Sequence, residues 1–116
     1  MSWTLFLDDL RDPPTGSSFQ LARSVLEAWA IIERQGAPSL VAFDHDLGDG
    51  EPTGLAFAKG LVERDLDQGG LFLPPGFAFS IHSDNRPGSE NIHGLLASYL
   101  DQREPALPTR RLPQFR

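Results

Sequence analysis

The sequence changes abruptly at residues 41–46, where three apolar residues run directly into Asp44, His45 and Asp46. The β-branched and aromatic side chains before the change favour a buried strand, and the glycine-rich loop that begins at Gly48 ends it. Open α/β sheets bind their ligands at the carboxyl ends of their strands. Two carboxylates that flank an imidazole at such a position indicate a site for a divalent cation, a phosphate group or both.

Two further apolar segments end in the same way. Residues 3–7 run into Asp8 and Asp9, and residues 77–81 run into His82 and Ser83. Strands that alternate with helices form right-handed parallel units, whose carboxyl ends share one edge of the sheet. A lone aspartate after a strand more often belongs to a turn, but three polar clusters at one edge favour a single site.

The segments around these strands predict the rest of the fold. Helices are predicted over residues 25–35 and 54–67, with Ser24 and Thr53 as their expected caps, and over residues 89–102. A short edge strand is predicted over residues 19–23. The second helix is expected to pack through an apolar stripe that contains Leu55, Ala58, Leu61, Val62 and Leu66. Two adjacent prolines in the loop at residues 13–18 exclude regular structure there.

Composition limits the possible classes of protein. The 116 residues suffice for one domain, which we expect to span residues 1–103, followed by a tail at 104–116 that contains prolines and arginines. No apolar run approaches the length of a membrane span, and the lack of cysteine and of a basic amino-terminal region fits a cytoplasmic protein. The net charge of −6 argues against duplex DNA as a partner, whereas a nucleotide or a short RNA end remains possible.

The aspartates at the strand ends are candidate metal ligands. Asp8, Asp9, Asp44 and Asp46 would repel one another at close range unless some took up protons or a cation held them together. Magnesium binds through one or two carboxylates together with water and phosphate oxygens. The sequence therefore predicts Mg²⁺, or another divalent cation, next to a phosphate group.

The remaining candidates each have a structural alternative. His82 and His45 are suited to proton transfer, although a histidine in a turn or at a strand end can be purely structural. Ser83 is a candidate phosphate contact or a helix cap, and Arg86 is a candidate phosphate contact or a solvated side chain. Arg11 follows the first acidic pair closely and could form a structural salt bridge with it.

Four short motifs together resemble the cyclic-phosphate-processing receiver domains, a variant of the response-regulator receiver fold. They lie at residues 5–14, 43–48, 53–54 and 82–92, and the resemblance covers nearly everything from residue 5 to residue 100. It implies a three-layer, flavodoxin-like α/β fold with a parallel sheet of about four strands. It also implies that Asp8 and Asp9 match the receiver acidic pair, that Asp44 matches the phospho-acceptor, and that Ser83 lies near the receiver hydroxyl position.

The sequence departs from ordinary receivers in ways that bear on function. Receivers carry a phosphate-binding lysine after a fifth strand, but the single lysine here is Lys59, inside a predicted helix. The proline-rich loop replaces the first helix, and the fifth strand is weak or missing. Phosphorelay signalling is therefore not expected, and a histidine could take over part of the role of the lysine.

The resemblance implies a substrate with a cyclic phosphate end, on a nucleotide or RNA, and together with the candidate metal ligands it predicts a metal-dependent phosphodiesterase or phosphohydrolase that acts by hydrolysis or phosphoryl transfer. Asp44, His45 and His82 are the expected catalytic residues, and Ser83 and Arg86 the expected phosphate contacts. Two alternatives remain open. The pair of aspartates at 44 and 46 is similar to that of haloacid-dehalogenase-type phosphatases, in which Asp44 would be a covalent nucleophile. The domain could also be a non-catalytic module that binds a nucleotide or a partner.

Overall fold

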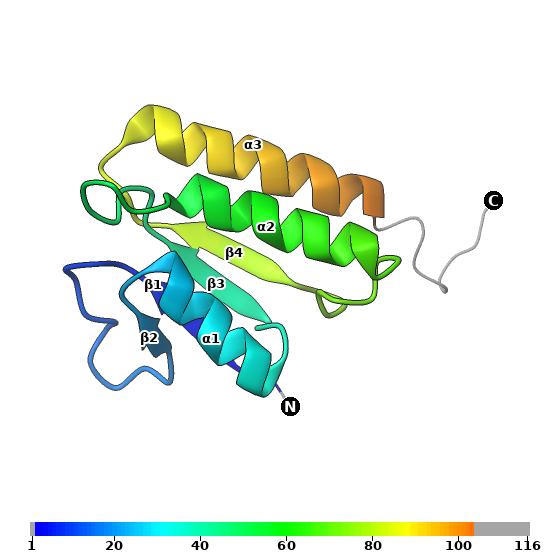
Figure 1. Cartoon of the computed structure of the whole chain (residues 1–116), viewed down its shortest axis with the longest axis horizontal. Helices are drawn as coiled ribbons and strands as arrows, with labels where there is room; N and C mark the ends of the chain where they lie inside the picture. Colours follow the sequence, from blue (N-terminus) through cyan, green and yellow to red (C-terminus); the bar gives the residue numbers. More distant parts are fainter. Residues whose placement is uncertain (1, 104–116) are drawn as a thin grey trace.

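The computed structural model describes residues 2–103, which form a parallel sheet and three helices (Figure 1). In chain order the elements are β1 (Thr4–Leu7), β2 (Gln20–Ala22), α1 (Val25–Gln35), β3 (Leu40–Phe43), α2 (Gly54–Asp67), β4 (Ala78–Ile81) and α3 (Arg86–Arg103). The strand order is β2-β1-β3-β4, and every neighbouring pair is parallel. All four carboxyl ends therefore lie at one edge of the sheet, as the sequence predicts.

The three helices pack on one face of the sheet. Side chains of β1 and β3 that alternate along the strands, such as Leu5 and Phe43, are fully buried in the same cluster as Ala28 of α1, Phe57 of α2 and Ile92 of α3. Figure 1 shows α2 and α3 running side by side above β4, with α1 over the other half of the sheet. A single hydrophobic core thus joins the helices to one face of the sheet.

The face of the sheet opposite the helices is covered in part by aromatic side chains. Phe6 points to this side, where its ring stacks on His82 at 4.5 Å between centroids and meets the edge of Phe19 at 5.6 Å. No helix forms between β1 and β2, as the two adjacent prolines predict, so within residues 2–103 the helices of the expected three-layer fold all lie on one side. That part of the chain also contains no fifth strand, and β4 is an edge strand. The predicted tail at 104–116 lies outside the described residues.

The predicted helix boundaries are largely confirmed. Helix α1 begins after Ser24, whose side chain accepts a hydrogen bond from the amide of Glu27, and α2 begins after Thr53, which does the same for Ala56. Helix α3 begins three residues before the predicted start, because Asn85 accepts a hydrogen bond from the amide of Gly88 and so serves as its cap.

Helix α2 buries a different face from the predicted one at two positions. Leu66 is exposed, whereas Phe57 is fully buried against the sheet. Asp65 is also fully buried, where it accepts hydrogen bonds from the Tyr99 hydroxyl at 2.6 Å and from Arg103 at 3.2 Å. The prediction for Leu66 was wrong because Asp65, four residues after Leu61, continues the buried face of the regular helix, and its partners on α3 compensate the burial of its charge.

Within residues 2–103, no helix combines the length and apolar character that crossing a membrane requires.

Candidate functional site

The strand ends are fixed by one backbone hydrogen bond each beyond the regular ladder. The amides of Asp8, Asp44 and His82 each donate to the carbonyl oxygen of the last residue of the neighbouring strand, at 2.8 to 3.1 Å. The backbone therefore stays in register for one residue after each strand. This register brings the side chains of three strand ends to the same edge of the sheet.

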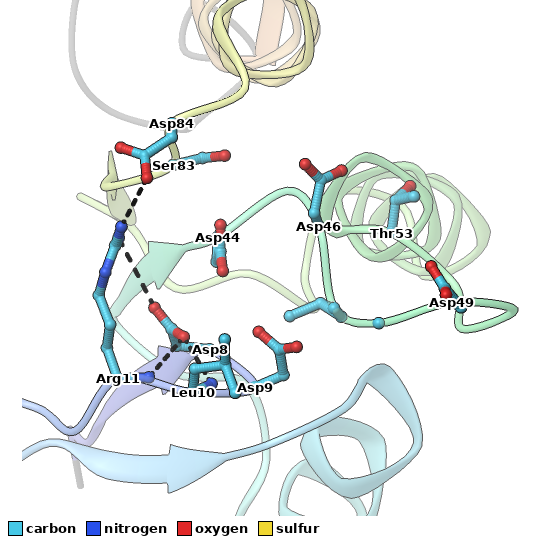
Figure 2. Close-up of a pocket in the computed structure, with 12 residues that line it drawn as sticks. Asp8, Asp9, Leu10, Arg11, Asp44, Asp46, Asp49, Thr53, Ser83 and Asp84 are labelled. Carbon is cyan, nitrogen blue, oxygen red and sulfur yellow. Dashed lines mark hydrogen bonds and ion pairs between the residues drawn. The ribbon is translucent and has the colours of Figure 1, made fainter.

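Three of the four predicted metal ligands converge there. Asp8, Asp9 and Asp44 each offer an oxygen, and these oxygens lie within 4.8 Å of one another. They line a cavity of about 480 Å³. Figure 2 shows the three carboxylates facing this cavity from the ends of β1 and β3. The other lining residues are Leu10, Arg11, Asp46, Leu47, Gly48, Asp49, Thr53, Ser83 and Asp84.

The two buried carboxylates of this cluster differ in their electrostatics. Burial raises the pKa of Asp44, and the neighbouring Asp8 carboxylate raises it further. A hydrogen bond from Ser83 lowers this pKa, but by less, so the pKa is raised overall. Burial also raises the pKa of Asp8, but backbone hydrogen bonds from Arg11 and Leu10 and the adjacent His82 outweigh this effect, so the pKa is lowered overall. Asp8 therefore stays ionised, and its negative charge makes ionisation of the neighbouring Asp44 less favourable.

Asp46 lies on a different side of the cavity and has partners of its own. Its Oδ1 lies 2.8 Å from Nδ1 of His45, and the Asn85 side-chain amide donates to both of its oxygens at 3.2 and 3.3 Å. These hydrogen bonds lower the pKa of Asp46. His45 itself lies against Gly88, where an added Cβ would come within 2.4 Å of the imidazole. The start of α3 thus fixes the position of His45.

His82 lies behind the cavity. Its Nε2 is 3.0 Å from Oδ2 of Asp8, and its ring stacks on Phe6. The two predicted catalytic histidines therefore bind different aspartates, and each aspartate lines the cavity. Neither imidazole is among the lining residues.

The amino-terminal end of α2 closes the cavity beside Asp44. Gly54 donates a backbone hydrogen bond to the carbonyl oxygen of His45 at 2.8 Å, and a Cβ at this glycine would meet the carbonyl oxygen of Asp44 at 2.1 Å. This close approach requires glycine. Thr53, the cap of α2, also lines the cavity.

The two arginines considered from the sequence differ in position. Arg11 lines the cavity, whereas the Arg86 side chain is 89% exposed, lies outside the lining and pairs with Glu90 at 3.5 Å on its own helix. Ser83, the other predicted phosphate contact, lines the cavity, and its hydroxyl also accepts a hydrogen bond from the amide of Asn85.

A parallel sheet with an acidic pair after β1, a further aspartate after β3 and a hydroxyl after β4 defines a receiver-like domain. The chain matches the family of cyclic-phosphate processing receiver domains over residues 3–98. Because the match spans most of the chain, the protein belongs to this family, and the resemblance found in the sequence is confirmed. No curated protein and no solved structure matches the chain.

Sequence reasoning missed three polar residues that line the cavity, which are Asp49, Thr53 and Asp84. It also missed the role of Asn85, which positions Asp46. For Asn85 a signal was present, because asparagine is a favoured cap at the start of a helix. The Thr53-Gly54 pair could have suggested a close backbone approach beside a cap.

Proposed function

We propose that this receiver-like domain is an enzyme that opens cyclic phosphate ends of nucleotides or RNA with the help of a divalent cation. The observation that supports this most is the convergence of three carboxylates in a cavity that Ser83 and Thr53 also line. In such sites carboxylates bind the cation, water and phosphate oxygens complete its coordination, and hydroxyl groups can donate hydrogen bonds to the phosphate. The family provides the substrate class.

The residues at the site fit a hard cation such as Mg²⁺. Asp8, Asp9 and Asp44 offer oxygen ligands alone, which is the donor set that magnesium prefers. Burial raises the pKa of Asp44 and the neighbouring Asp8 carboxylate raises it further, and a cation beside both carboxylates would favour their ionised forms. When bound, the cation would polarise the phosphate and stabilise the charge that develops on its oxygens. Asp46 would act from the other side of the cavity, through water.

The reaction needs two proton transfers. Hydrolysis of a cyclic phosphodiester forms one P–O bond from water and breaks one ring P–O bond, so one proton leaves the water and one reaches the leaving oxygen. His82 and His45 are our candidates for these transfers, and because neither imidazole lines the cavity, each would act through the lining aspartate that it contacts, Asp8 or Asp46. Ser83 would bind a phosphate oxygen.

Direct attack by water fits the site better than a covalent phospho-aspartate. The haloacid-dehalogenase route needs the second aspartate, Asp46, to act as a general acid. Hydrogen bonds from His45 and Asn85 lower the pKa of Asp46 and keep it ionised. An ionised Asp46 has no proton to donate.

We place the activity in the cytoplasm because the sequence has no cysteine.

Phosphorus NMR tests this proposal directly. Cyclic mononucleotides with a 2′,3′-phosphate and short RNA with the same end are incubated with the protein, with Mg²⁺ or with a chelator. We expect a phosphomonoester resonance with Mg²⁺ only, its loss in Asp44→Asn, and its retention in Asp101→Asn, an exposed charge change far along α3. Untouched substrates that nevertheless bind would identify a non-catalytic module and refute the enzyme.

A further inference from the structure

The cavity is strongly unbalanced in charge. Among residues 2–103, its lining contains six aspartates and a single basic side chain, that of Arg11. A phosphate that enters such a cavity meets mainly negative groups, so within this part of the chain a bound cation and this guanidinium are its positive partners. The position of Arg11 therefore bears on how the substrate is held.

The backbone of Arg11 is anchored from two sides. Its amide donates to Oδ1 of Asp8 at 2.8 Å, and its carbonyl oxygen accepts a hydrogen bond from Nη1 of Arg23 at 2.7 Å. Arg23 also pairs with Asp12 at 2.6 Å. The base of the Arg11 side chain is thus fixed to the same carboxylate that the proposed cation would use.

The guanidinium of Arg11 crosses the cavity edge from the end of β1 to the end of β4 (Figure 2). It donates to the carbonyl oxygen of His82 through Nη1 and to Oδ2 of Asp84 through Nη2, the latter at 3.0 Å, and Nη1 lies 3.9 Å from Oδ2 of Asp8. A guanidinium has five N–H donors, and the side chain is 48% exposed, so donors remain for an anion. Asp84 is 95% exposed, and such a surface ion pair holds its partner weakly.

We infer that Arg11 is the phosphate-binding cation of this site, and that Asp84 holds its guanidinium in place until the phosphate arrives. The inference rests on the proposed function. It assigns to Arg11 the contact that the sequence suggested for Arg86, whose side chain lies outside the cavity and pairs with Glu90. A planar guanidinium binds two oxygens of a phosphate at once, which favours a terminal or cyclic phosphate group over a neutral ligand.

The position of Arg11 predicts opposite effects on the two ligands. Replacing Arg11 by glutamine removes a positive charge near Asp8, so Mg²⁺ should bind a few-fold more tightly while phosphate binds at least about tenfold more weakly. Replacing Asp84 by asparagine frees the guanidinium and removes a negative charge, so phosphate should bind a few-fold more tightly. A gain of affinity cannot come from misfolding.

Isothermal titration calorimetry measures both affinities, first with Mg²⁺ alone and then with inorganic phosphate added to the Mg²⁺-saturated protein. The variants are Arg11→Gln, Arg11→Lys, Asp84→Asn and Arg86→Gln, with Arg34→Gln on α1 as the charge-matched control. We expect Arg11→Lys to retain part of the phosphate affinity, and Arg86→Gln and the control to match the wild type.

Two results would overturn the inference, and they are distinguishable. Wild-type phosphate affinity in Arg11→Gln, or a phosphate loss in Arg86→Gln instead, would refute the role of Arg11 and leave the proposed function standing. A Mg²⁺-saturated wild-type protein that binds no phosphate would refute the proposed function together with the inference.

Discussion

Removing the charge of Asp44 should stabilise the metal-free protein, although the proposed activity depends on this residue. Asp44 is 9% exposed, and its oxygen lies within 4.8 Å of those of Asp8 and Asp9. At 4.8 Å, two unit charges repel by about 3.5 kcal/mol at an effective dielectric constant of about 20, and by about 0.9 kcal/mol at that of water. Hydrogen bonding from Ser83 offsets part of this repulsion. We expect Asp44→Asn to raise the free energy of unfolding by about 1 kcal/mol at pH 7.

The effect should depend on pH in a defined direction. The pKa of Asp44 is raised, first by burial and then by Asp8, so the protonated form fits the folded state better than the ionised form. Below the ordinary value of 3.8, Asp44 is neutral in both states and asparagine brings no advantage. As the pH rises from 3.8 to the raised pKa, the unfolded state loses this proton before the folded state does, so Asp44 lowers the stability of the wild type; above the raised pKa the advantage of Asp44→Asn is constant.

Urea unfolding of wild type and Asp44→Asn in chelator, from pH 4 to pH 7, measures the difference in their free energies of unfolding. In a thermal melt, a gain of about 1 kcal/mol corresponds to a rise in Tm of about 4 °C. Asp8→Asn should do the opposite, because the lowered pKa of Asp8 means that its ionised form stabilises the fold above pH 3.8. Asp101→Asn controls for net charge. An Asp44→Asn protein no more stable than wild type at pH 7 would refute the electrostatic account, and so would equal effects of Asp44→Asn and Asp8→Asn.

Two further substitutions test how the scaffold holds the site. Gly54→Ala would push a Cβ into the carbonyl oxygen of Asp44, so we expect a loss of about 1–3 kcal/mol in urea unfolding and weaker Mg²⁺ binding, whereas Gly94→Ala, which faces open space on α3, should be neutral or stabilising. Tyr99→Phe removes the donor to buried Asp65, so we expect a loss of about 1–3 kcal/mol at neutral pH. Burial and Asp65 raise the pKa of Tyr99 to about 12, so only the wild type should lose this contribution as the pH rises from 10 to 12; equal stability of the two proteins at pH 7 would contradict the account.

The order of strands and helices could be predicted from the sequence because it depends on local signals. Caps at Ser24 and Thr53 and the turn from apolar to acidic residues after β3 each act over a few residues, and the structure agrees with them. The inward turn of Asp65 could not be predicted, because its partners Tyr99 and Arg103 lie more than 30 residues away in another helix. An aspartate in an amphipathic helix is otherwise expected in solvent.

The same distinction separates the predictable part of the site from the rest. The parallel sheet rule alone brought Asp8, Asp9 and Asp44 together, because strand ends share an edge whatever the side chains do. The directions of the long side chains depend on tertiary partners instead. Arg11 is 73 residues from Asp84, and the sequence contains no sign that they meet. Arg86 follows Ser83 by only three residues after β4, but it lies at the start of α3, outside the cavity lining, and pairs with Glu90.

The charge of the cavity also implies an order of binding. The six aspartates and one arginine that residues 2–103 contribute give the lining a negative charge before any ligand arrives, so a phosphate anion alone approaches against this field. A divalent cation held by Asp8, Asp9 and Asp44 reverses this field locally. Binding free energies are linked, so if Mg²⁺ tightens phosphate binding by some factor, phosphate must tighten Mg²⁺ binding by the same factor. Calorimetric titrations in both orders should therefore yield one coupling factor. Asp44→Asn weakens Mg²⁺ binding, so it should reduce this coupling factor but not the affinity for phosphate measured in chelator.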